Sequence, residues 1–352
     1  MLFGSFDCRR SSCNITGKQM TDWIEWDPAY STTRRVRNVA PEVVEAELKA
    51  LQKSEDQFKT ILFLPEGEGR KGEGGLRTKG YYKKSTNDNP LITVITVVYN
   101  GEQHLEETIL SVINQTYDNV EYIIIDGGSI DGTLNIIQKY EHAIDYWVSE
   151  KDNGIYCAMN KGIDLAMGEF VGFVNSDDFL YEEILSELGS MKKSDKFDFT
   201  LGDVDIYSQC SKYQETNIHS EEIILNKKYI FHMPTHHLGF YVRKIILKKV
   251  GKFNTDYKLR ADFDLLSRVI DSTKSFLILK KRVGGFRLGG VSGSYATFIE
   301  NNKILKNRNV GIFRRALNII PSMLKIFIID NVPKPIVGWL RNKFGSGRYI
   351  AK

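Results

Sequence analysis

Short apolar runs alternate with amphipathic segments between residues 91 and 174. The runs at 91–98, 120–125, 146–149 and 170–174 are rich in β-branched and aromatic residues and predict strands. Apolar residues at helical spacing between the runs predict three helices, and Asn100 with Gln103 has the pattern of a capping box for the first. Strands and helices that alternate at short intervals indicate βαβ units. The sequence therefore predicts an α/β fold with a mainly parallel sheet.

The pattern is less regular on both sides of this region. After residue 178 it predicts a helix from Tyr181, strands within 197–207, 239–242 and 276–279, a basic helix up to residue 250, a helix opened by Asp262, and a Gly-rich loop over 284–293. Residues 65–90 are rich in Gly, Lys and Arg, which is typical of a solvated linker or of a loop that wraps phosphates. We divide the chain into an N-terminal extension with this Gly/Lys-rich loop (1–89), a main domain (90–300) and a C-terminal segment (301–352).

Charge is distributed unevenly along the 352 residues. The net charge is +4, yet the chain after Asn302 holds eleven Lys and Arg and a single acid, Asp330. Apolar residues in this segment recur at helical spacing beside Arg314, Arg315 and Lys325. Such a basic amphipathic segment suits either a membrane interface or ordinary packing on a core. A basic end on an acidic body indicates an anionic partner, and the sequence has no nucleic-acid recognition module, so we expect membrane contact.

The cysteines and the apolar segments suggest where the protein works. Cys8, Cys13, Cys157 and Cys210 form no C-x-x-C pair, which is simplest to explain by free thiols in a reducing compartment. The sequence shows neither a signal peptide nor an apolar run of the ~18–20 residues that a spanning helix needs. We expect a cytoplasmic protein that is peripheral on the inner face of a membrane.

Carboxylates follow several predicted strands at the end where ligands bind in open α/β sheets. Asp126 follows one strand and precedes two glycines, and Asp177 with Asp178 follows another. Two adjacent carboxylates repel each other unless a cation or hydrogen-bond donors hold them, and a hard divalent cation shared with a phosphate would do so. The alternatives are ordinary ones, a turn aspartate for Asp126, a helix cap for one of Asp177 and Asp178, and another helix cap for Asp262. The helix start at Asn153, followed by Lys161, could face a diphosphate.

Together these motifs resemble family-2 glycosyltransferases, which are inverting enzymes of the GT-A fold. The resemblance covers roughly residues 90–295 and rests on many short pieces in the right order. The pieces are Val97-Val-Tyr-Asn100-Gly, Ser111-Val-Ile-Asn-Gln115, Ile124-Ile-Asp126-Gly-Gly-Ser, Asp131-Gly-Thr, Ser149-Glu-Lys-Asp152-Asn153-Gly-Ile-Tyr, Ala158-Met-Asn160-Lys161-Gly, Asn175-Ser-Asp177-Asp178, Gly202-Asp203, His236-His237, Ala261-Asp262-Phe-Asp264 and Gly289-Gly290-Val-Ser292. The segment from Glu73 to Gly80 also resembles one that precedes the catalytic domain in some bacterial polysaccharide transferases.

The resemblance implies a role for each matching residue. Tyr99, Asn100 and Asp126 would bind the nucleotide of the sugar donor, with Asn153, Lys161 and Asn175 along the diphosphate and ribose. Asp177, supported by Asp178, would hold Mn²⁺ or Mg²⁺ on the diphosphate. Asp262 would be the general base, and His236 and His237 would line the acceptor side. Cys157 departs from the family, because close relatives commonly have Asp there and a thiol is a weak acceptor.

The resulting hypothesis is a bacterial surface-polysaccharide glycosyltransferase. It would move a sugar from a nucleoside-diphosphate donor, expected to be UDP-linked, to a saccharide or lipid-linked acceptor. A sugar nucleotidyltransferase would need a Gly-rich basic phosphate loop after the first strand, where this chain has Tyr99-Asn-Gly-Glu-Gln103. A binding protein without transfer activity is the other alternative. The presence of Asp126, Asp177, Asp178 and Asp262 together argues against such a binding protein, and Cys157 argues for it.

Overall fold

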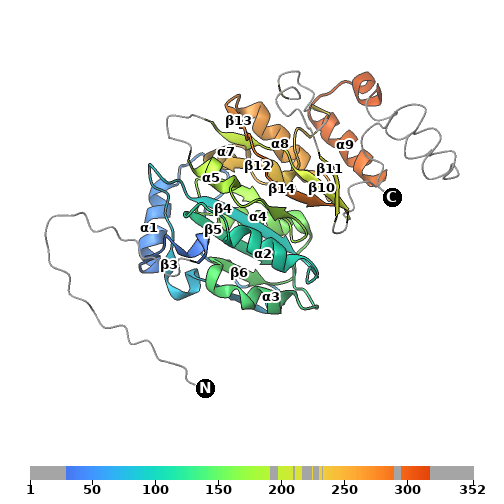
Figure 1. Ribbon diagram of the computed structural model, residues 1–352. Helices are drawn as coiled ribbons and strands as arrows, with labels where there is room; N and C mark the ends of the chain where they lie inside the picture. Colours follow the sequence, from blue (N-terminus) through green and yellow to red (C-terminus); the bar gives the residue numbers. More distant parts are fainter. Residues whose placement is uncertain are drawn as a thin grey trace, which may run out of the picture.

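The computed structural model describes residues 29–190, 197–208, 211–215, 224, 230–231, 233–288 and 295–317. Its centre is an eight-stranded sheet with strand order β13-β9-β12-β7-β4-β5-β6-β2 (Figure 1). The four predicted strands are its parallel core, in which β4 pairs with both β5 and β7, and β5 with β6. These are β4 (Ile92–Val98), β5 (Val120–Asp126), β6 (Tyr146–Ser149) and β7 (Phe170–Phe173). The prediction of a mainly parallel α/β fold is confirmed.

Helices cover both faces of the sheet because alternate residues of each strand point to opposite faces. On β4, Val94 and Val98 pack in one hydrophobic cluster with α2, whereas Ile95 and Val97 pack in the other with α4 and α8. The helices are α2 (Leu105–Ile113), α3 (Thr133–Lys139), α4 (Ile155–Leu165), α5 (Ile184–Gly189), α7 (Lys244–Val250) and α8 (Ala261–Ser272). The later strands of the main sheet are β9 (Phe199–Leu201), β12 (Phe240–Arg243) and β13 (Phe276–Ile278).

The Gly/Lys-rich segment is built into the main sheet. β2 (Gly72–Gly74) pairs antiparallel with β6 and forms the edge strand of the sheet, so the interpretation as a polar loop is wrong for these residues, although most of 65–90 is irregular. Glycine lets β2 lie against Trp147, since a Cβ on Gly74 would crowd the indole ring. The rest of the described N-terminal region comprises η1 (Ser31–Thr33), β1 (Arg37–Asn38), α1 (Pro41–Leu51), η2 (Arg77–Lys79) and β3 (Tyr81–Tyr82).

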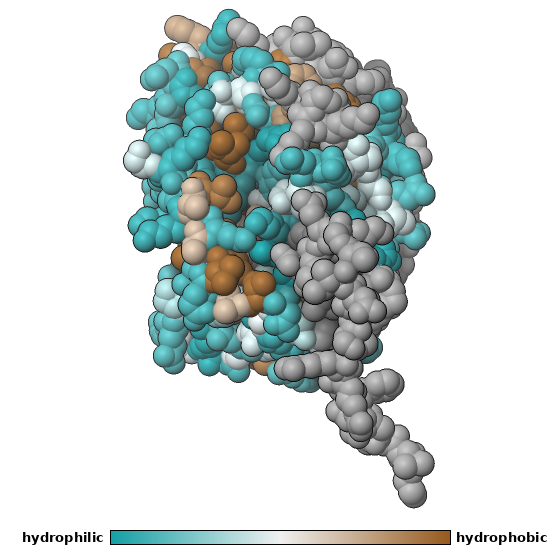
Figure 2. All heavy atoms as spheres, turned by 90° about the vertical axis from the view of Figure 1, so that its left-hand side faces the viewer, coloured by the Kyte–Doolittle hydropathy of each residue, from teal (hydrophilic) through white to brown (hydrophobic). Residues whose placement is uncertain are grey.

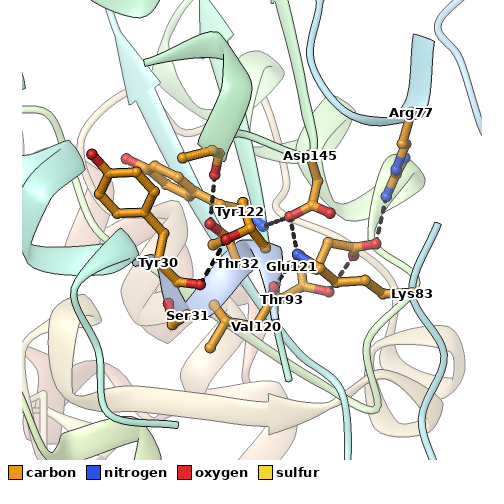
Figure 3. A network of polar contacts seen from close by, with 12 residues as sticks. Tyr30, Ser31, Thr32, Arg77, Lys83, Thr93, Val120, Glu121, Tyr122 and Asp145 are labelled. Atoms are coloured by element: carbon orange, nitrogen blue, oxygen red, sulfur yellow. Dashed lines mark hydrogen bonds and ion pairs between the residues drawn. The ribbon is translucent and has the colours of Figure 1, made fainter. Parts of the chain in front are cut away.

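Two buried ion pairs attach this N-terminal region to the amino-terminal ends of strands β5 and β6 (Figure 3). Arg77 lies 2.7 Å from Glu121 at the start of β5, with both side chains fully buried. Lys83 lies 2.7 Å from Asp145, just before β6. Glu121 also accepts from Thr93 Oγ1 at 2.6 Å. Every charge in this network has a partner, so the network can be buried without an unpaired ion.

A second sheet lies beside the carboxyl-terminal end of β7. Its order is β11-β10-β14-β8, from β8 (Phe179–Leu180), β10 (Asp205–Ser208), β11 (Ser211–Glu215) and β14 (Gly284–Arg287). The predicted helix from Tyr181 begins only at Ile184, because residues 179 and 180 pair with β14. The predicted Gly-rich loop is a strand over Gly284–Arg287, where a Cβ on Gly284 would collide with the backbone of Phe179. Its remainder, 289–293, lies outside the described residues.

Apolar side chains are exposed near the end of the described chain. After α9 (Tyr295–Asn307), a helical turn over 312–317 leaves Phe313 84% and Leu317 77% exposed, next to Arg314 and Arg315. The rest of the predicted amphipathic segment lies outside the described residues. Within the part that is described, no helix is long and apolar enough to cross a membrane. On the face shown in Figure 2, the hydrophobic side chains drawn in colour gather in small patches among hydrophilic ones.

Candidate functional site

The predicted site residues that follow β4, β5 and β7 lie at one edge of the sheet. Tyr99 and Asn100 come directly after β4, Asp126 ends β5, and Asn175 follows β7. The pairing of β4 with both neighbours places Val98 opposite Asp126 and Ile95 opposite Phe173. Because parallel strands end at the same edge, residues distant in sequence meet there. The sequence prediction of a shared edge for these residues is therefore confirmed by the sheet.

Asp126 is buried and already engaged. Its carboxylate accepts hydrogen bonds from the backbone N–H and hydroxyl of Ser129 and, at 2.5 Å, from the hydroxyl of Ser149. Tyr99, by contrast, is 65% exposed, and its ring lies next to Gly127. The structure thus presents an open aromatic surface beside a fixed loop, while Asp126 shapes that loop.

Asn100 does not cap a helix. It has a positive φ of 51°, and its side-chain oxygen accepts from the backbone N–H of Ile130 at 2.9 Å. The following helix, α2, begins at Leu105 without a side-chain cap. The capping-box prediction is wrong because Asn, which tolerates the left-handed region, is used here to join the loops after β4 and β5.

Residues 175–178, just after β7, form a turn in which the two aspartates differ. Asp178 is fully buried, and its carboxylate accepts from the backbone N–H of Arg287 at 3.0 Å and lies 3.3 Å from Nε2 of His237. The strand β8 follows both aspartates, so the interpretation of either one as a helix cap is wrong. Within the described chain, the carboxylate of Asp177 receives no hydrogen bond from another residue, and the buried Oδ1 of Asn175 likewise has no partner.

The surroundings of Asp177 raise its pKa above the ordinary value. Burial is the larger cause, and the adjacent carboxylate of Asp178 adds to it. Both causes oppose the ionised form, so a cation placed against Asp177 would relieve them. Among the described residues no cluster of three or more His, Cys, Asp or Glu could hold a metal by itself. The oxygens of Asp177 and Asn175 nevertheless fit a hard divalent cation that takes its remaining ligands from a diphosphate and water.

Asp262 lies in the first turn of α8, where Arg260 is the residue before the helix. Its Oδ1 accepts from the backbone N–H of Phe263 at 2.8 Å and from the hydroxyl of Tyr156 at 3.3 Å. No described residue donates to its Oδ2, which is therefore available to a bound hydroxyl group. Tyr156 belongs to one of the motifs but has no role predicted from the sequence, and it is itself fixed by stacking on Phe253 with the ring centroids 5.4 Å apart.

The two histidines differ in their electrostatics. Burial lowers the pKa of His236 to about 4, so this ring is neutral near pH 7; it stacks on Phe286 at 4.5 Å between centroids. Burial also opposes the charged form of His237, but Asp178, Asp262 and Asp177 together raise its pKa. One histidine thus senses all three carboxylates, which brings Asp262 and the turn after β7 into a single site.

Lys161 is held by protein carboxylates. Its Nζ lies 2.6 Å from Glu150 and 2.5 Å from Asp152, and Glu150 also pairs with Arg70 of the N-terminal region at 2.7 Å. Asn153, at the turn before α4, is exposed. Glu150 and Arg70 are absent from the sequence prediction of the site.

The free Cys157 is partly buried, with its Sγ 3.6 Å from the carbonyl oxygen of Asn153, while Cys8, Cys13 and Cys210 lie outside the described residues.

Comparison with known proteins agrees with this arrangement. Residues 93–253 match the family model described as Glycosyl transferase family 2. A putative teichuronic acid biosynthesis glycosyltransferase of Bacillus subtilis, TuaG, is 38% identical over 120 residues, which are 33% of this chain and 48% of TuaG. An uncharacterized glycosyltransferase of Rickettsia typhi is 28% identical over 211 residues, 57% of this chain and 66% of that protein.

Among solved structures, S. aureus TarS 1-349 in complex with UDP has a TM-score of 0.51 at 18% identity, covering 71% of this chain and 78% of TarS 1-349. This likeness supports the GT-A fold expected from the sequence. The chain spans about half to two thirds of the length of the curated relatives described above.

Proposed function

We propose that the protein, whose residues 93–253 match the family model described as Glycosyl transferase family 2, is a glycosyltransferase of bacterial surface-polysaccharide biosynthesis. It transfers a sugar from a nucleoside-diphosphate donor to a saccharide or lipid-linked acceptor, with inversion at the anomeric carbon. One observation carries the proposal. The charges of Asp177 and Asp262, from segments 85 positions apart, both act on His237 and raise its pKa, and both residues keep carboxylate oxygens to which no described residue donates.

Asp262 is the proposed general base. Tyr156 and the N–H of Phe263 hold Oδ1 and so orient the carboxylate, while Oδ2 takes the proton of the acceptor hydroxyl. As that proton moves, the acceptor oxygen bonds to the anomeric carbon and the bond from this carbon to the diphosphate oxygen breaks. The nucleoside diphosphate leaves with the electron pair. A single displacement of this kind inverts the anomeric centre and needs only one protein base.

Asp177, with Asn175 beside it, would hold Mn²⁺ or Mg²⁺, which supplies charge stabilisation to the leaving diphosphate when bound. Asp178 would support it, because its Oδ1 already accepts from the N–H of Arg287 while its Oδ2, 3.3 Å from Nε2 of His237, makes no hydrogen bond. Tyr99 would stack on the nucleotide base, and Asp126 would keep the adjoining loop in place. A UDP-linked donor is favoured because TarS has been solved with UDP and with UDP-GlcNAc.

The proposal is tested with purified protein and a panel of nucleotide sugars in Mn²⁺ or Mg²⁺. Hydrolysis or transfer of one donor is expected, and Asp262→Asn should lower it by about 10²–10⁴-fold, the usual contribution of a general base. Asp177→Asn should remove the part of this activity that depends on added Mn²⁺ or Mg²⁺. Asp271→Asn is the matched control at the other end of α8, where Asp271 pairs with Arg308. Full activity in both site variants would overturn the assignment.

We further propose that the protein binds peripherally to the cytoplasmic face of the inner membrane through its basic C-terminal segment. The exposed Phe313 and Leu317 next to Arg314 and Arg315, and the eleven basic residues after Asn302, support this. Sedimentation with anionic vesicles should be strong for the full chain, weak for a chain ending at Asn309, and weakened by Phe313→Asp. Equal recovery of the full chain with neutral and anionic vesicles, or none with either, would refute the proposal.

A further inference from the structure

The turn that carries Asp177 is held on two sides by side chains that the proposed reaction does not itself use. From α2, the hydroxyl of Thr108 lies within hydrogen-bond distance of two carbonyl oxygens of the turn, 2.6 Å from that of Asp178 and 3.0 Å from that of Ser176. From β14, Nη1 of Arg287 donates to the carbonyl oxygen of Asp177 at 2.7 Å. The carbonyl oxygens of Ser176, Asp177 and Asp178 therefore each lie within hydrogen-bond distance of a side-chain donor.

Arg287 makes further contacts that fix its own position. Its backbone N–H donates to the carboxylate of Asp178 at 3.0 Å, and Nη2 pairs with Glu107 of α2 at 2.6 Å. The guanidinium lies 5.0 Å from the ring centroid of Phe179, the first residue after the turn. Only 11% of the side chain is exposed. A planar guanidinium can make these contacts at the same time, which a lysine ammonium on a flexible stem cannot.

The turn closes on itself through a hydrogen bond from the N–H of Asp178 to the carbonyl oxygen of Asn175 at 3.0 Å. With the backbone held, the carboxylate of Asp177 and Oδ1 of Asn175 receive no hydrogen bond from another described residue, and Oδ2 of Asp178 makes none but lies 3.3 Å from Nε2 of His237. The contacts of Thr108 and Arg287, which we call the clamp, fix the backbone from which the side chain of Asp177 projects.

We propose that Arg287 and Thr108 are positioning residues, which hold the backbone of residues 175–178 so that Asp177 is presented for metal-dependent binding of the nucleoside diphosphate. The inference rests on the proposed function for the identity of the ligand, and on the contacts above for the clamp. Arg287 acts through the carbonyl of Asp177 and Thr108 through those of Ser176 and Asp178. Neither side chain needs to touch the nucleotide-sugar donor.

The test measures UDP binding by calorimetry with and without Mn²⁺ for the wild type, Arg287→Met, Arg287→Lys, Thr108→Val and Thr108→Ser. Arg287→Met should weaken the Mn²⁺-dependent gain in affinity at least about tenfold, the equivalent of one charge-assisted hydrogen bond. Affinity without metal should change less than about twofold, within the error of such single contacts. Thr108→Ser should behave as wild type and Thr108→Val should not, with Arg287→Lys intermediate.

Arg282→Met is the matched control, because Arg282 lies just before β14 and pairs with Asp205, away from the turn. Amide hydrogen exchange of a peptide spanning residues 174–180 tests the clamp without any ligand. It should be faster in Arg287→Met and unchanged in Arg282→Met. Unchanged exchange together with an unchanged Mn²⁺ effect would overturn the inference. If wild type shows no metal-dependent UDP binding while exchange still accelerates, the proposed function fails and the clamp stands.

Discussion

Carboxylates lie at both the amino-terminal and the carboxyl-terminal ends of the parallel strands, and at the carboxyl-terminal ends Asp126 is held by Ser129 and Ser149 whereas Asp177 is not held by any described side chain. At the amino-terminal edge, Glu121 and Asp145 are buried with Arg77 and Lys83, which reach in from the N-terminal region (Figure 3). At the carboxyl-terminal edge, Asp177 is given no protein donor and sits beside a second carboxylate. Burial opposes the ionised form of Glu121, but Arg77, Thr93 and the N–H of Met167 lower its pKa. Burial raises the pKa of Asp145 in spite of Lys83, and it raises that of Asp177 together with the neighbouring carboxylate of Asp178, so the clearest contrast is between Glu121 and Asp177.

The difference separates carboxylates that hold the fold from those available to a ligand. A buried charge with a complete set of partners is structural, since removing one partner leaves an unpaired ion. A charge that the protein leaves unsatisfied at the ligand-binding edge is a stability liability that a bound cation would remove. Acidic residues alone therefore do not identify the site; their partners do. The predictions below test this contrast by changing one edge at a time.

The largest effect is expected from removing residues 1–89. The deletion takes away β2, Arg77 and Lys83, so it leaves Glu121 and Asp145 buried without counter-charges. We expect the remaining chain not to fold, as judged by circular dichroism and limited proteolysis. A chain that begins at residue 29 retains every contact described for this region and should fold normally. A well-folded 90–352 fragment would show that the amino-terminal edge does not depend on the N-terminal region.

A smaller loss is expected from Arg77→Met. Breaking a fully buried pair from one side typically costs ~3–5 kcal/mol of unfolding free energy. Adding Glu121→Leu should restore part of it, because the unpaired carboxylate is then removed as well. Arg35→Met is the control: Arg35 pairs with Asp118 with both side chains about a third exposed, and such pairs contribute ~0–1 kcal/mol. Urea unfolding that places both single variants within 1 kcal/mol of each other would contradict the assignment.

Acid should weaken the amino-terminal edge in a defined pH window. The pKa of Glu121 is lowered on folding, so its contribution is present above the unfolded value of about 4.3 and is lost as pH falls through the lower folded value. Unfolding free energy measured from pH 6 to pH 3 should therefore decline below about pH 4.5, and Glu121→Gln should flatten the decline. An equally steep profile in the variant would assign the acid sensitivity to other groups.

Much of this arrangement was predictable from the sequence, and the exceptions have a common cause. Apolar runs and helical spacing are local signals, and they located the four parallel strands and the edge where Asp126 and Asp177 lie. Partners are not local. Nothing near residue 72 indicates that a Gly-rich stretch will complete a sheet 75 residues away at β6, or that Arg77 will reach Glu121. Arg287, in what looks like a glycine loop, and Thr108, on an ordinary amphipathic helix, acquire their role only through the turn they contact.

The most direct test compares Asp177→Asn with Glu121→Gln in metal-free protein, by thermal unfolding, followed by the Mn²⁺-dependent transfer assay. The two substitutions replace a carboxylate by an amide at opposite edges of one sheet. Replacing the Asp177 carboxylate by an amide removes its repulsion with Asp178 and the cost of burying its charge, so this variant should unfold at the same or a higher temperature. It should also lose metal-dependent activity. Glu121→Gln should unfold several degrees lower and stay active while folded. If Asp177→Asn instead destabilises the protein as much as Glu121→Gln does and stays active, the separation of structural from ligand-binding carboxylates is wrong.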